Sequence, residues 1–352
     1  MSWNRSRPRP IGRVALAAVA AGVALCALQT GAAAAAAGAP PPAYNWVHLS
    51  PPTSPSARDS MASAYDAATR QFIMYGGETA AGVPLSDTWS WTGSTWAQLH
   101  PKARPPALAG EVMAYDAAKH QLLLFGGLNV GGTVQTSTWL WTGATWQAVK
   151  TSASPSGGLE PSLAWDAASS QLVLFGGITN TQTVEDQTWT WTGTNWELAS
   201  PATSPPALGG ASMAYYPTTA NLILFGGTEN YGVADLDTSN ETWAWTGTNW
   251  VKQSPATVPA SRFAATLAYD AASFQMILIG GAAEVGNTLV TYSGTWTWSG
   301  GTWNAKAPAT VPEHRAVATM TFDGATNQLV LFGGSPEPGQ DYNGTWLWER
   351  QP

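Results

Sequence analysis

The chain has 352 residues and a formal net charge of −7, from 15 basic and 22 acidic side chains. All 22 acidic residues lie after residue 40, whereas four of the 15 basic residues lie before it, so the later part carries 11 − 22 = −11. This acidic balance argues against binding to nucleic acids or to anionic membrane surfaces. Cys26 is the only cysteine, which excludes an internal disulfide.

The first forty residues have the pattern of a secretory signal peptide. Four arginines precede an apolar stretch from Val14 to Leu28, and small residues and three prolines follow it. This order predicts a signal peptide and short linker over residues 1–39, with export of the rest. The alternative is an uncleaved membrane anchor, although a span needs about 20 solidly apolar residues. We expect a secreted protein without a membrane span after cleavage, and association with the cell envelope stays open.

Six glycine pairs recur along the remaining chain, each at the end of an apolar run. Their spacings are 50, 50, 50, 54 and 53 residues, and the pairs are Gly76-Gly77, Gly126-Gly127, Gly176-Gly177, Gly226-Gly227, Gly280-Gly281 and Gly333-Gly334. A period near fifty residues indicates repetition of one supersecondary unit. We expect each pair to end a buried strand at a place where a side chain would clash with aromatic residues packed between units.

Each complete repeat contains four short predicted strands. The first ends in a motif such as Ala64-Tyr65-Asp66, whose aspartate opens a polar turn, and the second is a continuous apolar run such as Leu122–Phe125. The third carries a Trp-x-Trp motif such as Trp89 and Trp91, and a four-residue hairpin turn joins it to a fourth strand that begins with Trp. The tryptophans recur in every repeat, which favours packing between units over the alternative of carbohydrate platforms.

Four antiparallel strands repeated six times predict an all-β, six-bladed β-propeller over residues 40–352. The approximate blade boundaries are 54–100, 101–150, 151–200, 201–254, 255–306 and 307–349. The last repeat lacks a fourth strand, while residues 44–49 resemble a fourth strand with nothing before it. We therefore expect residues 44–49 to complete the last blade and to close the ring, which removes exposed sheet edges.

The glycine pair, the aromatic strand, the hairpin and the tryptophan together resemble the kelch-repeat family, over residues 44–349. This family includes the propeller domain of galactose oxidase, secreted sialic-acid mutarotases and many protein-binding propellers, so the resemblance implies a fold and no single function. Copper-radical chemistry needs a cysteine crosslinked to tyrosine and several histidine ligands. Apart from Cys26 the chain has no cysteine, and its four histidines are scattered, so we expect no galactose oxidase activity, no metal site and no cofactor.

Binding residues are expected where the repeats differ from one another. The turns after the first and third strands are short and alike, whereas the loops on the opposite face vary in length and sequence and include Tyr231 and Glu284. The starts of the innermost strands open onto the same face, and three of them carry Arg58, Arg262 and Arg315, in blades that closure makes neighbours. In kelch proteins an arginine here can contact acidic ligands; the alternative is that these arginines hold loops through backbone carbonyls.

The sequence assigns no catalytic residue, since no Ser-His-Asp set or phosphate-binding loop can be recognised. The leading hypothesis is a secreted, non-catalytic and monomeric binding module for a protein or a surface glycan, which uses the variable-loop face. The alternative is a carbohydrate enzyme such as a sialic-acid or sugar-acid mutarotase. That reaction would use an arginine at the channel mouth to hold a carboxylate, for example Arg315, with Glu313 or His314 beside it as a proton shuttle.

Overall fold

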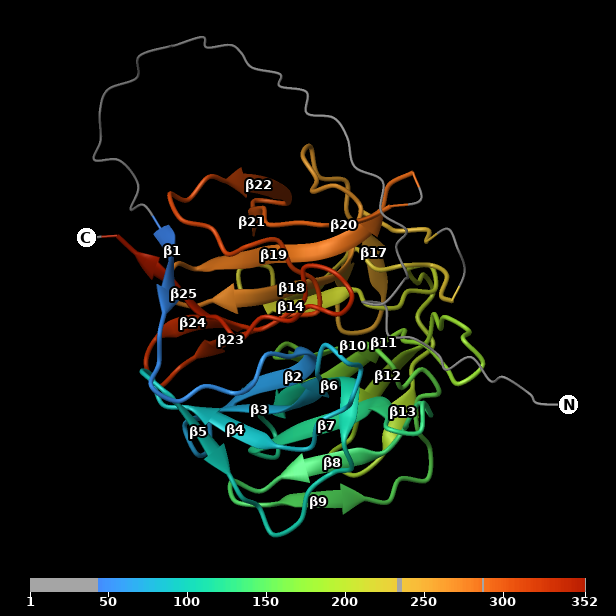
Figure 1. Ribbon diagram of the computed structural model, residues 1–352. Helices are drawn as coiled ribbons and strands as arrows, with labels where there is room; N and C mark the ends of the chain where they lie inside the picture. The colour runs from blue at the N-terminus through green and yellow to red at the C-terminus, as the bar shows by residue number, and fades with distance from the viewer. Residues whose placement is uncertain (1–43, 233–235, 287, 352) are drawn as a thin grey trace, which may run out of the picture.

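The computed structural model describes residues 44–232, 236–286 and 288–351. In this part of the chain all regular secondary structure is β-strand, and the strands form six antiparallel sheets around a central axis (Figure 1). The prediction of an all-β, six-bladed propeller is therefore confirmed. The expected signal peptide and linker lie outside the described residues. None of the residues that the structure describes forms a helix long and apolar enough to cross a membrane.

Each blade has four strands, which we name in order from the axis to the rim. The innermost strands are β2 (Asp59–Asp66), β6 (Leu108–Asp116), β10 (Ser162–Asp166), β14 (Ser212–Tyr216), β18 (Phe263–Asp270) and β23 (Thr319–Asp323). The second strands are β3 (Gln71–Glu78), β7 (Gln121–Asn129), β11 (Gln171–Phe175), β15 (Asn221–Phe225), β19 (Gln275–Glu284) and β24 (Gln328–Phe332). The third strands are β4 (Thr88–Trp91), β8 (Thr138–Trp141), β12 (Thr188–Trp191), β16 (Thr242–Trp245), β21 (Thr295–Ser299) and β25 (Thr345–Arg350). The outer strands are β5 (Trp96–Leu99), β9 (Trp146–Val149), β13 (Trp196–Leu198), β17 (Trp250–Lys252), β22 (Thr302–Lys306) and β1 (Tyr44–Leu49).

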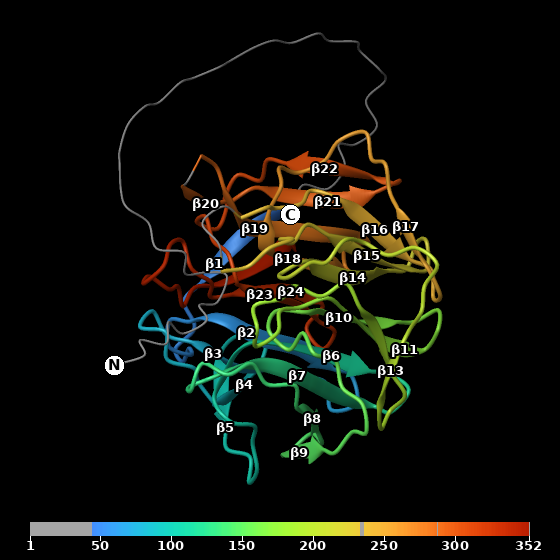
Figure 2. The ribbon, with the colours of Figure 1, turned by 90° about the vertical axis from the view of Figure 1, so that its right-hand side faces the viewer.

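Blades one to six begin with β2, β6, β10, β14, β18 and β23, and blade six is completed by β1. Strand β1 pairs antiparallel with β25, from Tyr44 opposite Arg350 to Leu49 opposite Thr345. The two ends of the described chain therefore lie side by side in one sheet (Figures 1 and 2). This pairing confirms that residues 44–49 complete the last blade. Blade five has one further strand, β20 (Leu289–Thr291), which pairs with an extension of β19.

A tryptophan at or near the start of each outer strand ties its blade to the preceding one. Its indole N–H donates a hydrogen bond of 2.9 to 3.1 Å to the hydroxyl of the first threonine in the neighbouring third strand, and all six bonds lie in the interior. The pairs are Trp46–Thr295, Trp96–Thr345, Trp146–Thr88, Trp196–Thr138, Trp250–Thr188 and Trp303–Thr242. Because buried indole N–H groups need acceptors, this repeated bond fixes how each pair of blades packs.

The glycine pairs are required for a reason other than the one the sequence suggested. Both glycines of every pair have positive φ, a conformation that favours glycine. A Cβ on Gly176 would overlap the backbone carbonyl oxygen of Leu208 in the next blade, rather than an indole ring, and the other pairs are similarly crowded by backbone. The expected clash with aromatic residues is thus wrong, and the close approach is between backbones. In blades one, two and five the second strand also continues past its glycine pair.

Candidate functional site

The variable loops and the starts of the innermost strands lie on one face of the ring, which we call the mouth. One residue per blade narrows the channel just below it, and each has positive φ: Ser60, Gly110, Glu160, Gly210, Ala264 and Val317. Five backbone hydrogen bonds link these six residues in a row around the channel, from Ser60 to Val317, Val317 to Ala264, Ala264 to Gly210, Gly210 to Glu160 and Glu160 to Gly110. Four of the six are not glycine, and a left-handed backbone costs such residues about 1–2 kcal/mol each. The fold therefore maintains strain around the channel.

Two adjoining cavities of about 140 and 150 Å³ occupy the channel. Their walls are built mainly from small side chains of the innermost strands, such as Ala211 and Ala265, and both cavities reach Glu111. The first cavity is also lined by Ser60 and Glu160. Cavities of this size admit a small chemical group rather than a folded segment of a partner.

Glu111 occupies an unusual place between blades one and two. Its side chain is 4% exposed, and its carboxylate lies against Gly76 and Gly127, without a well-formed hydrogen bond at either oxygen. In the junction between blades six and one, the corresponding slot against Gly333 holds Met61, so the slot is suited to an apolar group. Burial raises the pKa of Glu111 to about 8, although nearby backbone amides and Arg58 favour the charged form. This carboxyl group is consequently mostly neutral at pH 7.

The three predicted arginines are all buried, with exposures of 1%, 3% and 1% for Arg58, Arg262 and Arg315. Each donates from Nε to the carbonyl two residues earlier and from Nη1 to the first glycine carbonyl of its own blade. None of the three is among the residues that line either channel cavity. The guanidinium groups therefore support the blade starts, as the backbone alternative expects. Ligand binding by these arginines stays a prediction.

Glu313 accepts a hydrogen bond of 2.8 Å from Arg315 Nη2. In the sugar-acid enzyme hypothesis, Arg315 holds the substrate carboxylate while Glu313 moves a proton, but here the two groups neutralise each other. A substrate carboxylate would have to displace Glu313, which is 57% exposed. Within the described residues, no group of three or more His, Cys, Asp or Glu side chains is placed to hold a metal ion.

Tyr231 and Glu284 both help to hold the loop of blade four over the mouth. Tyr231 is 7% exposed and packs with apolar residues contributed by blades two to six, including Ile178 and Phe263. Burial raises the pKa of Tyr231, and the nearby charges of Glu160 and Glu78 raise it further. Glu284 accepts a hydrogen bond of 2.9 Å from the backbone N–H of Leu236 in the blade-four loop. Their contact with a ligand stays a prediction.

Asp87 is a residue of this region that the sequence did not single out. Its carboxylate accepts bonds of 2.6 and 2.9 Å from the guanidinium of Arg58 and one of 2.6 Å from the indole of Trp89. Burial alone would raise the pKa of Asp87, but these donors and the charge of Arg58 lower it. The signal for Asp87 was present in the aligned repeats, because it directly precedes the Thr-Trp motif, where the other blades carry Ser137, Gln187, Glu241, Gly294 and Gly344.

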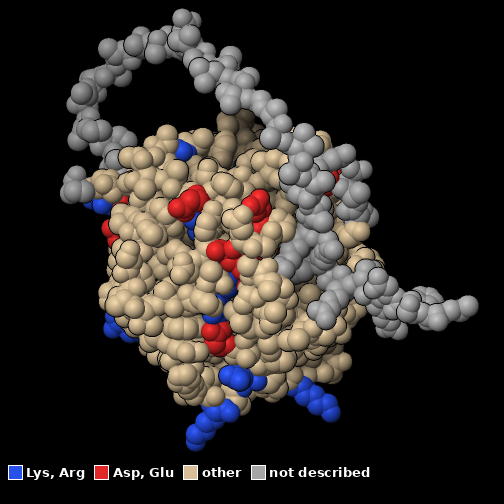
Figure 3. Space-filling view, in the orientation of Figure 1, with Lys and Arg blue, Asp and Glu red and all other residues tan. Residues whose placement is uncertain are grey.

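Charged side chains are sparse on the surface. In the space-filling view, acidic and basic groups gather near the middle of the visible face, and most of the surrounding surface is neither (Figure 3). Recognition on such a surface depends on a few polar groups and on shape rather than on a strong overall field.

Comparison with known proteins supports the fold and leaves the function open. No family model matches this chain, and no curated protein matches it either. Among solved structures 405 chains match, so the architecture is too widespread to indicate one activity. One of them is the structure of YjhT, with a TM-score of 0.65 and 17% sequence identity, covering 84% of this chain and 96% of that chain. At this level of identity the similarity shows the propeller fold alone.

Proposed function

We propose that this chain is a secreted, non-catalytic propeller of the kelch-repeat type that binds a protein or glycan ligand on the mouth. The observation that carries the proposal is that the blades share their turn structures on one face of the ring and differ in their loop structures on the mouth. On the opposite face, five of the six turns after the innermost strands are held in the same way, by an aspartate that accepts a backbone N–H two residues later. The hairpin turns of blades one to four likewise share one threonine-to-carbonyl bond.

On the mouth each blade has its own loop structure. Blade five adds a β-hairpin with β20, blade four directs Tyr231 into the apolar cluster, and blade three presents Thr179, Thr181 and Thr183 in a mutually bonded turn. A rigid scaffold that varies on one face only is typical of binding proteins. The pairing of Arg315 with Glu313 argues against their use in acid–base chemistry, and it favours binding over turnover.

The test compares two substitutions of exposed apolar residues by aspartate, on opposite faces. Val130→Asp alters a mouth loop where the side chain is 56% exposed, and Phe274→Asp alters a turn of the opposite face where the side chain is 74% exposed. Calorimetric titration with cell-wall glycan fragments, sialic acid and secreted proteins from the same source is expected to show binding that Val130→Asp weakens and Phe274→Asp leaves unchanged.

Catalysis is tested in parallel by following anomer exchange of sialic and uronic acids with NMR. Unaltered exchange is expected, since Glu313 is paired with Arg315 and we assign no free acid–base pair among the described residues of the mouth. Accelerated exchange that is lost in Glu313→Gln would overturn the non-catalytic proposal. Binding that is equally weakened by Phe274→Asp would overturn the assignment of the mouth.

A further inference from the structure

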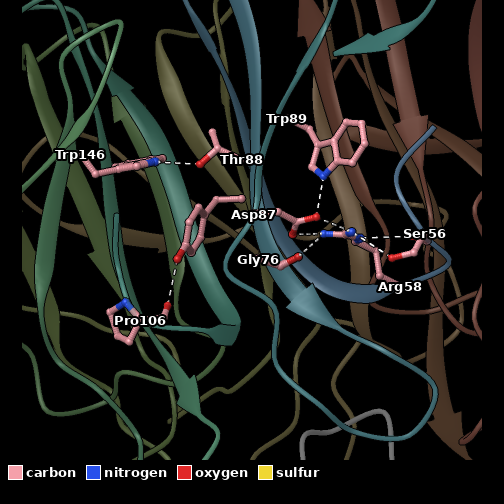
Figure 4. Close-up of polar contacts among 9 residues, drawn as sticks. Ser56, Arg58, Gly76, Asp87, Thr88, Trp89, Pro106 and Trp146 are labelled. Carbon is pink, nitrogen blue, oxygen red and sulfur yellow. Dashed lines mark hydrogen bonds and ion pairs between the residues drawn. The ribbon is translucent and has the colours of Figure 1, made fainter. Parts of the chain in front are cut away.

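Blade one contains a complete carboxylate-binding arrangement that is filled by the chain itself. Figure 4 shows the guanidinium of Arg58 facing the carboxylate of Asp87, with the indole N–H of Trp89 directed at the same carboxylate. Arg58 also donates to the carbonyl and the hydroxyl of Ser56 and to the carbonyl of Gly76. These bonds use all five N–H groups of the guanidinium, and the two-pronged contact with Asp87 is the geometry that suits carboxylates.

Blade five repeats this arrangement without the carboxylate. Arg262 makes the same two supporting bonds, from Nε to Ala260 at 3.0 Å and from Nη1 to Gly280 at 2.8 Å, so its guanidinium is placed as in blade one. The strand register is also the same, because Thr295 pairs with the residue before Gly280 as Thr88 pairs with the residue before Gly76. Gly294 therefore takes the position of Asp87.

No other carboxylate among the described residues compensates for this glycine. In blade six, which also has a glycine at this position, Glu313 bonds Arg315 from two residues earlier; the corresponding residue in blade five is Ala260. Arg262 uses two of its five N–H groups with described residues, against five for Arg58 and three for Arg315. Burial lowers the pKa of Arg262 to about 10, which leaves it charged at neutral pH. The result is a buried cation without an anionic partner among the described residues, an arrangement that costs stability.

The surroundings of Arg262 prepare its free edge for a planar anion. Its guanidinium lies over the ring of Tyr292, with 4.1 Å between the central carbon and the ring centroid, so one flat face is covered. Its Nη2 group donates no hydrogen bond to any described residue. Trp296 takes the position of Trp89, and its indole N–H has no hydrogen-bond partner in the described part of the chain. Whereas Trp89 is buried, Trp296 is partly exposed and Gly294 is exposed, so two of the three residues around the vacant position are in contact with solvent.

We infer that Arg262 and Trp296 form a binding site for a carboxylate group of the ligand, which takes the place that Asp87 occupies in blade one. The inference deepens the proposed binding function by giving one chemical feature of the ligand, and it rests on that proposal only for the biological role of the site. The carboxylate belongs to a sugar acid or to an acidic side chain of a peptide, and both share the planar, two-oxygen geometry.

Substitutions in blades one and five give a matched set of variants, which differ in how many of the two arginines, Arg58 and Arg262, lack an internal carboxylate; we call each such place a vacant position. Gly294→Asp restores the internal carboxylate; a Cβ there would meet only Trp296, at 3.4 Å from its Nε1, and Gly294 does not have positive φ. Asp87→Gly creates a second vacancy, in blade one. The wild type has one vacant position, Asp87→Gly has two and Gly294→Asp has none. Val285→Asp adds the same charge to an exposed position in the mouth loop of blade five and controls for net charge.

Thermal melting in sodium acetate, with sodium chloride at equal ionic strength as the reference, is the first experiment. The acetate-specific rise in melting temperature is expected to be largest for Asp87→Gly, intermediate for the wild type and Val285→Asp, and absent for Gly294→Asp. Equal responses in all four proteins would show a general salt effect and would overturn the inference. Because Gly294→Asp supplies its own anion, it is also expected to melt at a higher temperature than the wild type without acetate.

Titration calorimetry then distinguishes the sources of the carboxylate. Glucuronate is compared with glucose, which lacks the carboxylate, and with N-acetylglutamate as a model of an acidic side chain. Preference for glucuronate assigns a sugar acid and preference for N-acetylglutamate an acidic peptide; in either case Gly294→Asp is expected to weaken binding about tenfold or more. Failure of both acids to bind would overturn this site. Loss of glycan or protein binding through Val130→Asp but not through Gly294→Asp would overturn the site and leave the proposed function intact.

Discussion

Replacing Glu111 by glutamine is expected to change how the stability of the protein depends on pH. In the folded chain the carboxyl group lies in an inter-blade slot, and burial raises its pKa from 4.5 to about 8. The folded state therefore binds a proton more tightly than the unfolded state does. The contribution of the neutral carboxyl group is fully present below pH 4.5 and is lost as the pH rises through 8.

The size of the effect follows from the pKa shift. A shift of one unit corresponds to about 1.4 kcal/mol, so the rise from 4.5 to about 8 sets an upper limit of about 5 kcal/mol on the penalty at alkaline pH. Glutamine has nearly the same shape and does not ionise. Relative to the wild type, Glu111→Gln is expected to change little at pH 4.5 and to become progressively more stable up to pH 9, at up to about 1.4 kcal/mol per pH unit.

The assay is urea denaturation followed by tryptophan fluorescence, at intervals from pH 4.5 to pH 9. Glu197→Gln, on the exposed side of β13, is the control and is expected to show no such trend. A stability difference between Glu111→Gln and the wild type that stays constant within about 0.5 kcal/mol across this range would refute the reasoning. A difference that shrinks as the pH rises would do so as well, because it would mean that the folded protein prefers the ionised carboxylate.

Three further predictions concern the fold. Deletion of residues 44–49 removes β1 and leaves β25 as an open edge, so the melting temperature is expected to fall by well over 10 °C; an unchanged value would contradict closure by this strand. Gly176→Val places a side chain against a carbonyl of the next blade at a position with positive φ, and a loss of more than about 4 kcal/mol or failure to fold is expected in denaturation experiments. Ala264→Gly relieves a left-handed backbone and is expected to add up to about 1 kcal/mol, whereas Ala265→Gly, in an extended strand, should lose a similar amount.

The architecture could be predicted from the sequence because each blade repeats the same short sequence patterns. Each pattern spans only a few residues: the alternation of Trp89 and Trp91, the apolar run of the second strand and the aspartate of the turn. Their recurrence along the chain supports one and the same interpretation. Closure by residues 44–49 followed from counting strands. The reason for the glycine pairs did not follow, since the carbonyl of Leu208 approaches Gly176 from another blade, and that distance depends on how blades pack rather than on the sequence of either.

The candidate site was harder to predict because it depends on which carboxylate pairs with each arginine, and the spacing of these pairs differs between blades. The sequence identified Arg58, Arg262 and Arg315 as equivalent, which they are as supports for their glycine carbonyls. It did not show that they differ in their anionic partners, because one partner lies 29 residues later and another lies two residues earlier. Glu111 lies near the start of the innermost strand β6, but its raised pKa depends on burial, which its place in the sequence does not show.

Because the blades repeat one another, each can be compared with the others at equivalent positions. This comparison is the main argument for a carboxylate site at Arg262 in blade five. A single buried arginine bonded to two carbonyls can be explained as a support for a loop, and Arg262 alone would allow no more. Arg58 and Arg315 provide the same support, yet each also has a carboxylate that neutralises its charge. An arginine can therefore support these backbone carbonyls while a carboxylate neutralises its charge. Arg262 lacks such a carboxylate among the described residues, so the compensating charge is expected from a ligand. The acetate response of Gly294→Asp measures whether a carboxylate supplies it.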